Sequence, residues 1–227
     1  MICAQRHDTV QEGDLLLLHG GYKFLTTCYV KKGDVLINKF GTFKHDDMIG
    51  TEFGRLVSNT RGTTKLVALR PTPELWSISL KHRTQIVFSM DASVISYRLN
   101  LRPGSVVVET GTGSGSLSHH FVRAIQPTGH LHTFEFNEHR ATLAREEFDR
   151  HGIGSFVTVK HADAYADGFG LNHEANAVFL DLPMPWKAIE NAKAALVPNG
   201  VICSFSPCVE QVCIFPCVDV STCSSLK

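Results

Sequence analysis

The sequence predicts an α/β protein in which a small β-rich domain precedes a doubly wound parallel sheet. From Glu12 to about Leu80, short β-rich pieces are separated by glycine turns at spacings near ten residues, which is typical of a small barrel or sandwich. After residue 84, apolar strand-like runs alternate with helical segments, which is typical of a parallel sheet with crossover helices. The length of 227 residues is enough for both parts.

Strands are expected in the first part at residues 15–19, 24–30, 34–40 and 65–69. Pro71-Thr72-Pro73 marks the boundary, because its prolines interrupt regular structure. We therefore expect a β-barrel domain over residues 1–75, the sheet domain over 76–212, and an atypical cysteine-rich tail over 213–227.

In the second part, Asp91 is expected to cap a helix that runs to Leu99. Strands are expected at residues 106–108, 131–136, 156–160, 177–180 and 201–205. Helices are expected at residues 117–125, 138–151 and 187–196, with a turn at Pro198-Asn199-Gly200. Ligands of such sheets bind at the carboxyl ends of the strands, so we expect the functional residues there.

Charge is unevenly distributed along the chain, although the formal net charge is zero. Residues 1–102 hold 14 Lys or Arg and 9 Asp or Glu, whereas the remainder holds 8 and 13. A basic face that meets phosphates and an ordinary scatter of solvated charge explain this division equally well. No run approaches the roughly 18 apolar residues of a membrane span, and Arg6-His7-Asp8 interrupts the start where an export signal is apolar. We expect a cytosolic or nuclear protein.

Cysteine and histidine usage favours neither disulfides nor metal. Five of the seven cysteines lie in the last 25 residues without a CxxC pair, and the adjacent His119 and His120 point to different faces of an expected helix. Disulfide frameworks are typical of short secreted chains, and zinc sites have closely spaced ligand pairs. We therefore expect reduced thiols and no metal site.

The strongest chemical signal is the glycine loop after the strand at residues 106–108. It reads Glu109-Thr110-Gly111-Thr112-Gly113-Ser114-Gly115, so its third glycine comes one residue earlier than in the dinucleotide fingerprint GxGxxG. Glycines here let a ligand approach the backbone closely. An acidic residue ahead of the loop suits a cationic amino group better than a pyrophosphate, which describes S-adenosylmethionine.

Acidic residues also stand at the ends of the next two strands. Glu135 comes twenty residues after Gly115, where a carboxylate can accept both hydroxyls of a ribose. Asp163 ends the third strand, within reach of an adenine. One such residue is more often a helix cap or a solvated charge, but three at successive strand ends favour a ligand site.

The fourth strand runs into Asp181-Leu182-Pro183-Met184-Pro185-Trp186. The two prolines stiffen this loop, so Asp181 and Trp186 keep a fixed relation. The simpler interpretation is a rigid strand exit with an aromatic over the core. Because the loop lies where ligands are expected, we favour a second interpretation. In it, the Asp181 carboxylate lies beside the methyl donor and the loop holds a planar base.

These motifs together resemble one enzyme family. ETGTGSGSLSH, GHLHTFEFNEHRA, DLPMPW and SFSPCVEQV, with PTPELW and HRTQI upstream, are similar to the catalytic subunit of the eukaryotic, TrmI-like tRNA (adenine-N1)-methyltransferases that modify the T-loop adenine. The resemblance covers most of residues 12–212. It implies a class I methyltransferase fold with a Rossmann-like sheet, S-adenosylmethionine as cofactor, and transfer to N1 of that adenine, with similar mRNA sites as further targets.

The residue pattern and the resemblance assign roles to individual residues. Asp181 is the implied catalytic residue. Cofactor contacts are expected for Gln85, Val87, Glu109, Gly111, Gly113, Ser114, Gly115, Ser116, Glu135, Arg140, Asp163, Ala164 and Asp181. RNA contacts are expected for Gly20, Gly21, Tyr22, His82, Arg83, Phe88, Pro183, Pro185, Trp186, Ser204 and Ser206. Phe88 replaces the family's usual tyrosine, which preserves stacking but removes a hydroxyl.

A mechanism without metal follows from these roles. N1 lies on the pairing edge of adenine, so the base must be unpaired or swung out before it is methylated. Asp181 can then accept a hydrogen bond from the exocyclic amino group and so orient N1. Methylation makes the ring positive, and a nearby carboxylate favours that developing charge.

The resemblance also implies partners and a location. The family's eukaryotic enzyme is a nuclear heterotetramer of two catalytic and two non-catalytic chains, the latter needed for tRNA binding. After SFSPCVEQV the family continues through a helix and at least two strands, whereas this chain reads CIFPCVDVSTCSSLK, in which no helical period is expected. A truncated or alternative form is expected, unstable or poorly active unless a partner covers the open sheet edge. A non-enzymatic binding subunit, an inactive truncated product and a class I methyltransferase with another substrate remain alternatives.

Overall fold

The computed structural model describes residues 7–21 and 24–214, so the RNA contact expected at Tyr22 lies outside the described residues. The chain divides into two compact units, Met1–Lys81 and His82–Lys227. The boundary expected at residue 75 falls inside α1 (Pro73–Ser79), whose first turn is capped by the Thr72 hydroxyl. Within the described residues, no helix is both long and apolar enough to cross a membrane.

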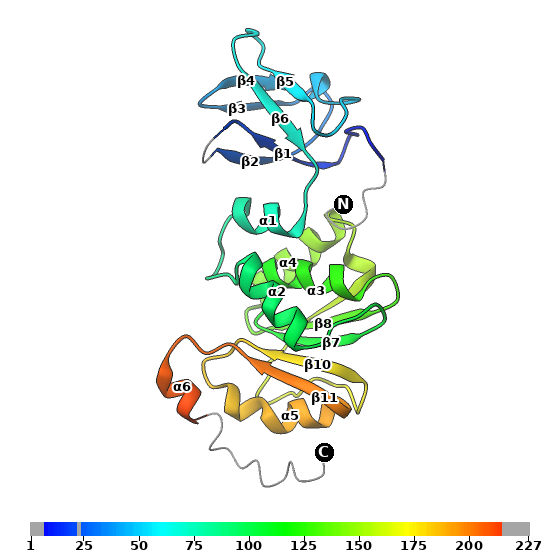
Figure 1. The fold of residues 1–227 in the computed structure, drawn as a ribbon, viewed down its shortest axis with the longest axis vertical. Coiled ribbons are helices and arrows are strands. Elements are labelled where there is room, and N and C mark those ends of the chain that lie inside the picture. Colours follow the sequence, from blue (N-terminus) through cyan, green and yellow to red (C-terminus); the bar gives the residue numbers. More distant parts are fainter. Residues whose placement is uncertain (1–6, 22–23, 215–227) are drawn as a thin grey trace. The chain divides into compact units, whose positions relative to one another are not determined.

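The first unit contains a four-stranded antiparallel sheet and a separate hairpin (Figure 1). The sheet has the order β2 (Leu25–Tyr29), β1 (Leu15–His19), β6 (Lys65–Leu69) and β5 (Leu56–Ser58). The hairpin pairs β3 (Val35–Asn38) with β4 (Gly41–Lys44), and the short helix η1 (His45–Asp47) follows. A small β-rich unit is therefore present, but its described strands form two sheets and not one closed barrel.

Both faces of β1 are covered, which explains its unbroken leucine run. Leu16 and Leu18 pack with Phe43 and Leu66 in the core of the first unit. Leu15 and Leu17, on the opposite face of the strand, are equally buried. A strand covered on both faces reads as a continuous apolar run and not as an alternating one.

The second unit is built on a five-stranded sheet in which every described pairing is parallel. Its strand order is β11 (Leu196–Ser204), β10 (Ala175–Leu180), β7 (Val106–Thr110), β8 (His130–Glu135) and β9 (Val157–His161). The chain starts in the centre at β7, moves outward through β8 and β9, and then returns to β10 on the other side of β7. The direction of winding therefore reverses beside β7, where ligands of this architecture bind.

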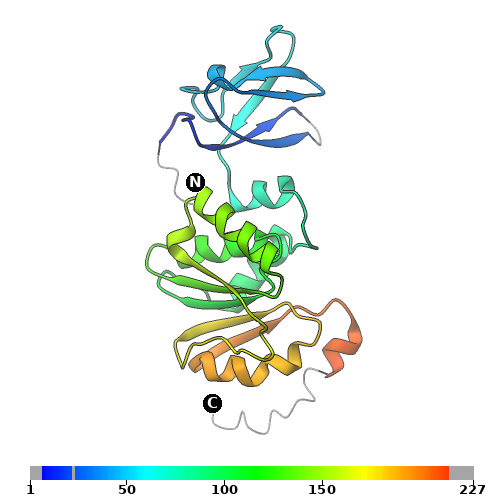
Figure 2. The same cartoon turned by 180° about the vertical axis from the view of Figure 1, so that it is seen from behind.

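Helices cover both faces of this sheet (Figures 1 and 2). On one face lie α2 (Ser89–Arg98), α3 (Ser116–Ile125) and α4 (Glu138–Arg150), and on the other lies α5 (Ile189–Ala195). The shorter elements are η2 (Gly154–Phe156), η3 (Pro185–Ala188) and α6 (Val209–Ile214). The predicted doubly wound architecture is confirmed.

Three local predictions need correction. Asp91 does not cap α2, because the helix begins at Ser89 and Asp91 lies within its first turn. The turn expected at Pro198-Asn199-Gly200 lies inside β11, since Leu196 pairs with Ala175 before the register shifts and Val201 pairs with Ala177. The helix α6 extends to Ile214, two residues into a stretch in which no helical period was expected.

Candidate functional site

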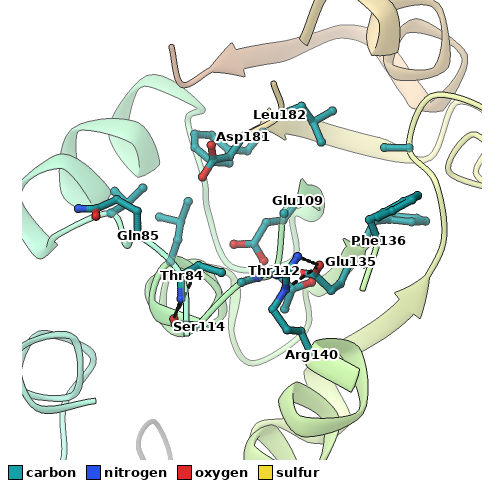
Figure 3. A pocket seen from close by; sticks show the side chains of 18 of the residues that line it. Thr84, Gln85, Glu109, Thr112, Ser114, Glu135, Phe136, Arg140, Asp181 and Leu182 are labelled. Carbon is teal, nitrogen blue, oxygen red and sulfur yellow. Dashed lines mark hydrogen bonds and ion pairs between the residues drawn. The ribbon is translucent and has the colours of Figure 1, made fainter. Parts of the chain in front are cut away.

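One cavity opens at the carboxyl ends of β7, β8, β9 and β10, entirely within the second unit (Figure 3). Its volume is about 570 Å³. The walls come from the glycine loop after β7, from the loops that follow the other three strands, and from residues 84–87 ahead of α2. The size lies within the range of clefts that hold small molecules of cofactor size.

Two glycines of the loop approach other residues of the cavity wall too closely for any larger residue. Gly111 has φ 79°, and a Cβ there would lie 2.7 Å from the backbone oxygen of Asp181. Gly113 has φ 53°, and a Cβ there would lie 2.5 Å from Oγ1 of Thr84. The loop therefore packs its backbone directly against the β10 exit and the residue 84 wall.

Glu135 is held as a carboxylate by four donors. Its Oε2 accepts the Gly113 amide at 2.9 Å, and its Oε1 accepts the Asn137 amide at 3.0 Å and the Arg140 Nε and Nη2 at 3.0 and 2.7 Å. Burial by itself raises the pKa of Glu135, but the hydrogen bonds from Arg140, Asn137 and Gly113 outweigh it and hold that pKa below its usual value. Oε2 receives only one of these four bonds, so it keeps room for a ligand hydroxyl.

Glu109 is the most deeply buried acid of the cavity, with 2% of its surface exposed. Ser118 of α3 donates to its Oε2 at 2.6 Å. Burial raises the pKa of Glu109 to about 7; hydrogen bonds from Ser118 and Thr133 oppose that rise, and the charges of Asp181 and Glu135 add to it. Near neutral pH this carboxyl group is therefore divided between its two protonation states, and a cation in the cavity would favour the charged one.

Asp181 directly follows β10, and its amide donates to the Thr110 oxygen at 3.3 Å. Figure 3 shows its carboxylate on the side of the cavity opposite Glu135 and Arg140. Burial of its cavity side raises the pKa of Asp181, although the residue keeps an exposed surface, so water still screens its charge. A ligand that fills the cavity removes part of that water.

The segment before α2 is fastened to the glycine loop. The Arg83 and Thr84 amides both donate to Ser114 Oγ, at 3.0 and 3.1 Å, and Ser116 Oγ donates to the Val87 oxygen at 3.1 Å. The Arg83 guanidinium pairs with Glu147 of α4 at 2.9 Å. The Arg83 side chain, expected to contact RNA, is thus engaged inside the unit, and the expected RNA contact remains a prediction.

All thirteen residues expected to contact a cofactor line this one cavity, and among the described residues of the RNA set Pro183 alone does so. The described residues of the RNA set that lie elsewhere are Gly20, Gly21, His82, Arg83, Phe88, Pro185, Trp186, Ser204 and Ser206. Gly20 has an evident packing role in the first unit, since a Cβ there would lie 2.6 Å from a methyl carbon of Leu66. The RNA contacts expected for these residues stay predictions.

The structure adds lining residues to which the sequence assigned no role. They are Thr84, Ile86, Thr112, Leu117, Phe134, Phe136, Ala162, Tyr165, Phe179 and Leu182. Phe136 is 72% exposed although it directly follows a buried strand residue. The sequence signal that could have indicated Phe136 is an aromatic residue directly after a strand-end acid, because a flat exposed ring at this edge can cover a base.

The sheet order, the glycine loop and the carboxylates at neighbouring strand ends define a class I S-adenosylmethionine-dependent methyltransferase fold. Among solved structures, an SAM-dependent O-methyltransferase from Thermotoga maritima matches with a TM-score of 0.84 and 27% identity, over 93% of this chain and 78% of that one. The fold is also that of the tRNA (m1A58) methyltransferase TrmI from Aquifex aeolicus, with a TM-score of 0.78 and 24% identity over 94% and 82%.

The model of the family described as the tRNA methyltransferase complex GCD14 subunit matches residues 66–220, and the chain belongs to this family. It is 45% identical over 207 residues to the tRNA (adenine(58)-N(1))-methyltransferase catalytic subunit of Dictyostelium discoideum, which is 89% of this chain and 66% of that protein. The corresponding Candida albicans subunit is 42% identical over 213 residues, which is 92% of this chain and 63% of that one. The chain therefore spans just under two thirds of the length of these relatives.

Proposed function

We propose that this chain acts as the catalytic subunit of a tRNA (adenine-N1)-methyltransferase and transfers a methyl group from S-adenosylmethionine to N1 of the T-loop adenine. The observation that carries the proposal is the gathering of Glu109, Glu135 and Asp181 around one cavity against a glycine loop. The names of the Dictyostelium and Candida relatives support the choice of acceptor. Similar adenines in mRNA are further candidate targets.

The cavity offers a matching group for each part of S-adenosylmethionine. Glu109 supplies a carboxylate for the ammonium of the methionine part, and the free side of Glu135 Oε2 supplies an acceptor for the ribose hydroxyls. Asp163 and Ala164 line the end where the adenine would lie, beside the exposed ring of Phe136. When bound, the cofactor supplies an electrophilic methyl group.

Asp181 is the residue that would act on the acceptor. Its carboxylate can accept a hydrogen bond from the exocyclic amino group of an adenine that has left its stacked position, which fixes the direction of N1. Its negative charge favours the positive charge that develops on the ring. Asp181 serves this purpose only when ionised, so its raised pKa moves the acidic limb of the activity to higher pH than an ordinary aspartate would give.

We further propose that tRNA is held jointly with a non-catalytic partner chain, in a nuclear assembly of two catalytic and two non-catalytic subunits. The family description as a subunit of a complex supports a partner. The zero formal net charge supports it as well, because tRNA capture by one chain alone normally relies on a strong basic field.

The direct test is transfer of a labelled methyl group to an unmodified tRNA transcript by this chain, co-expressed with the partner. The same transcript with its T-loop adenine replaced by guanine is the control. We expect label in the first transcript alone, located at N1. Absence of transfer when the chain binds cofactor and partner would refute the proposal.

A class I methyltransferase with a different acceptor is the second candidate. The 27% identity and TM-score of 0.84 to an O-methyltransferase favour it. The same labelling experiment separates the two, because an oxygen acceptor would leave label in both transcripts or in neither.

Cofactor affinity is expected to depend on pH through Glu109. The Glu109 pKa is raised to about 7, so its charge appears as the pH rises through that value, and a cationic ligand binds more tightly above it. The affinity falls again at higher pH, where the amino group of the ligand loses its proton. Calorimetric titration with S-adenosylhomocysteine across this range measures both limbs.

Glu109→Gln is expected to remove the rising limb alone. Glu146→Gln changes an exposed glutamate on α4 and is the matched control. An unsubstituted chain whose affinity is flat between about pH 6 and pH 7.5 would show that Glu109 does not face the ligand's cation.

A further inference from the structure

A single peptide unit in the loop after β10 is held from both sides by side chains of other segments. We call residues 181–186 the acceptor loop. The Met184 amide donates to Tyr165 Oη at 3.0 Å. Gln211 Nε2 donates to the Pro183 oxygen at 2.9 Å. That carbonyl and that amide belong to the same peptide group, between Pro183 and Met184.

This peptide is one that the prolines of the acceptor loop leave free to turn. Pro183 and Pro185 fix rotation about their own N–Cα bonds. The plane between Pro183 and Met184 turns instead about the Cα–C bond of Pro183 and the N–Cα bond of Met184, which no ring restrains. In a trans peptide the carbonyl and amide point in opposite directions, so one partner on each side fixes the plane.

The two partners come from distant segments, and the segment that carries Tyr165 is itself anchored. Tyr165 follows β9 and lines the cavity; its amide donates to Asp163 Oδ1 at 2.8 Å. Asn191 of α5 donates to the Ala164 and Tyr165 oxygens at 2.8 and 3.2 Å. Gln211 lies on α6. Tyr165 therefore connects the end of the cavity beside Asp163 and Ala164 to the loop that carries Asp181.

We propose that Tyr165 and Gln211 are positioning residues for methyl transfer, which clamp the Pro183–Met184 peptide and thereby hold the acceptor loop in the orientation that the methyl acceptor requires. This proposal rests on the proposed function, which supplies the identity of the methyl acceptor. The clamp itself restrains the conformation of the acceptor loop, and that restraint can be measured without any methyl acceptor.

Tyr165→Phe and Gln211→Met test the clamp with little change in size. The first removes the oxygen that accepts the Met184 amide and keeps the ring, and the second removes the amide that donates to Pro183. We expect kcat for methyl transfer to fall about 10-fold to 100-fold in each, the range expected when a reacting group is displaced by about an ångström. Affinity for S-adenosylhomocysteine is expected to stay within a factor of about two, since both variants keep every cavity contact except the Tyr165 hydroxyl.

Because both side chains restrain one peptide, the double variant is expected to lose less than the product of the two single losses. Tyr97→Phe, which changes a tyrosine that is 80% exposed on α2, and Glu210→Gln, next to Gln211 on α6, are the matched controls. Both controls are expected to retain the kcat of the unsubstituted chain. Independent, fully multiplicative losses would overturn a shared clamp.

Trp186 provides a readout that needs neither methyl transfer nor cofactor. The chain has two tryptophans, and Trp76 is 5% exposed in the first unit. Acrylamide reaches the buried Trp76 poorly, so the part of the tryptophan fluorescence that acrylamide quenches readily comes from Trp186 in the acceptor loop. Quenching is expected to increase in Tyr165→Phe and in Gln211→Met and to stay unchanged in the two controls. Unchanged quenching in both clamp variants would overturn the proposal.

These readouts separate failure of the clamp from failure of the proposed function. If the unsubstituted chain with its partner methylates no tRNA, the proposed function fails, while Trp186 quenching still decides the clamp. If it methylates tRNA and both clamp variants keep their kcat and their quenching, the clamp alone is wrong.

Discussion

Asp181→Ala is expected to lower methyl transfer by about 10²-fold to 10³-fold while cofactor binding remains measurable, which is the loss typical of removing one electrostatic group from a transition state. The carboxylate stands at the end of β10, across the cavity from Glu135 and Arg140. Its removal takes away both the hydrogen bond that directs N1 and the charge that favours the methylated ring. Single-turnover kinetics with labelled cofactor measure the step itself.

Asp181→Asn separates the two contributions of the carboxylate. The amide oxygen still accepts a hydrogen bond, but it carries no charge, and neutral hydrogen bonds are about half as strong as charge-assisted ones. An intermediate rate is therefore expected. Glu146→Gln, on an exposed side chain of α4, is the control for loss of a negative charge. An alanine variant that retained the full rate would remove Asp181 from the mechanism.

Gly111→Ala is expected to abolish cofactor binding and transfer together. The residue has φ 79°, and an added Cβ would lie 2.7 Å from the Asp181 backbone oxygen. Backbone atoms cannot rotate away as a side chain does, so the glycine loop or the exit of β10 must move. Calorimetry with S-adenosylhomocysteine, together with thermal melting, measures the loss of binding and of stability.

Gly170→Ala is the matched control, since it has a similar positive φ of 62° but its nearest neighbour would be Lys160 Nζ, the end of a flexible side chain, at 3.5 Å. The control carries the cost of a left-handed alanine, about 1–2 kcal/mol, without the clash. If Gly111→Ala bound cofactor as tightly as Gly170→Ala does, the close approach of the loop to Asp181 would have no functional importance.

Residues at strand ends could be predicted from sequence because their positions follow from topology alone. Once the parallel sheet was recognised, Glu109, Glu135, Asp163 and Asp181 had to share one edge. The glycine loop could be placed for the same reason, since its spacing fixes where the strand ends and the helix begins.

Side-chain pairings between distant segments left no pattern in the sequence. The direction of Arg83 depends on Glu147, and the roles of Tyr165 and Gln211 depend on a peptide group of the acceptor loop. The position of Pro198-Asn199-Gly200 inside β11 depends on the pairing of Leu196 with Ala175. Such contacts are decided by packing, which local propensity does not encode.

The acidic lining of the cavity also determines which molecules stay out. ATP and nicotinamide dinucleotides contain the same adenosine as the methyl donor. Their phosphates would enter a space beside Glu109 and Asp181, where like charges repel, the more so as water is displaced. The loop also lacks the lysine with which nucleotide-binding loops neutralise a phosphate. The carboxylates thus discriminate by sign of charge, so that an adenosine bearing a cation is admitted and one bearing anions is refused.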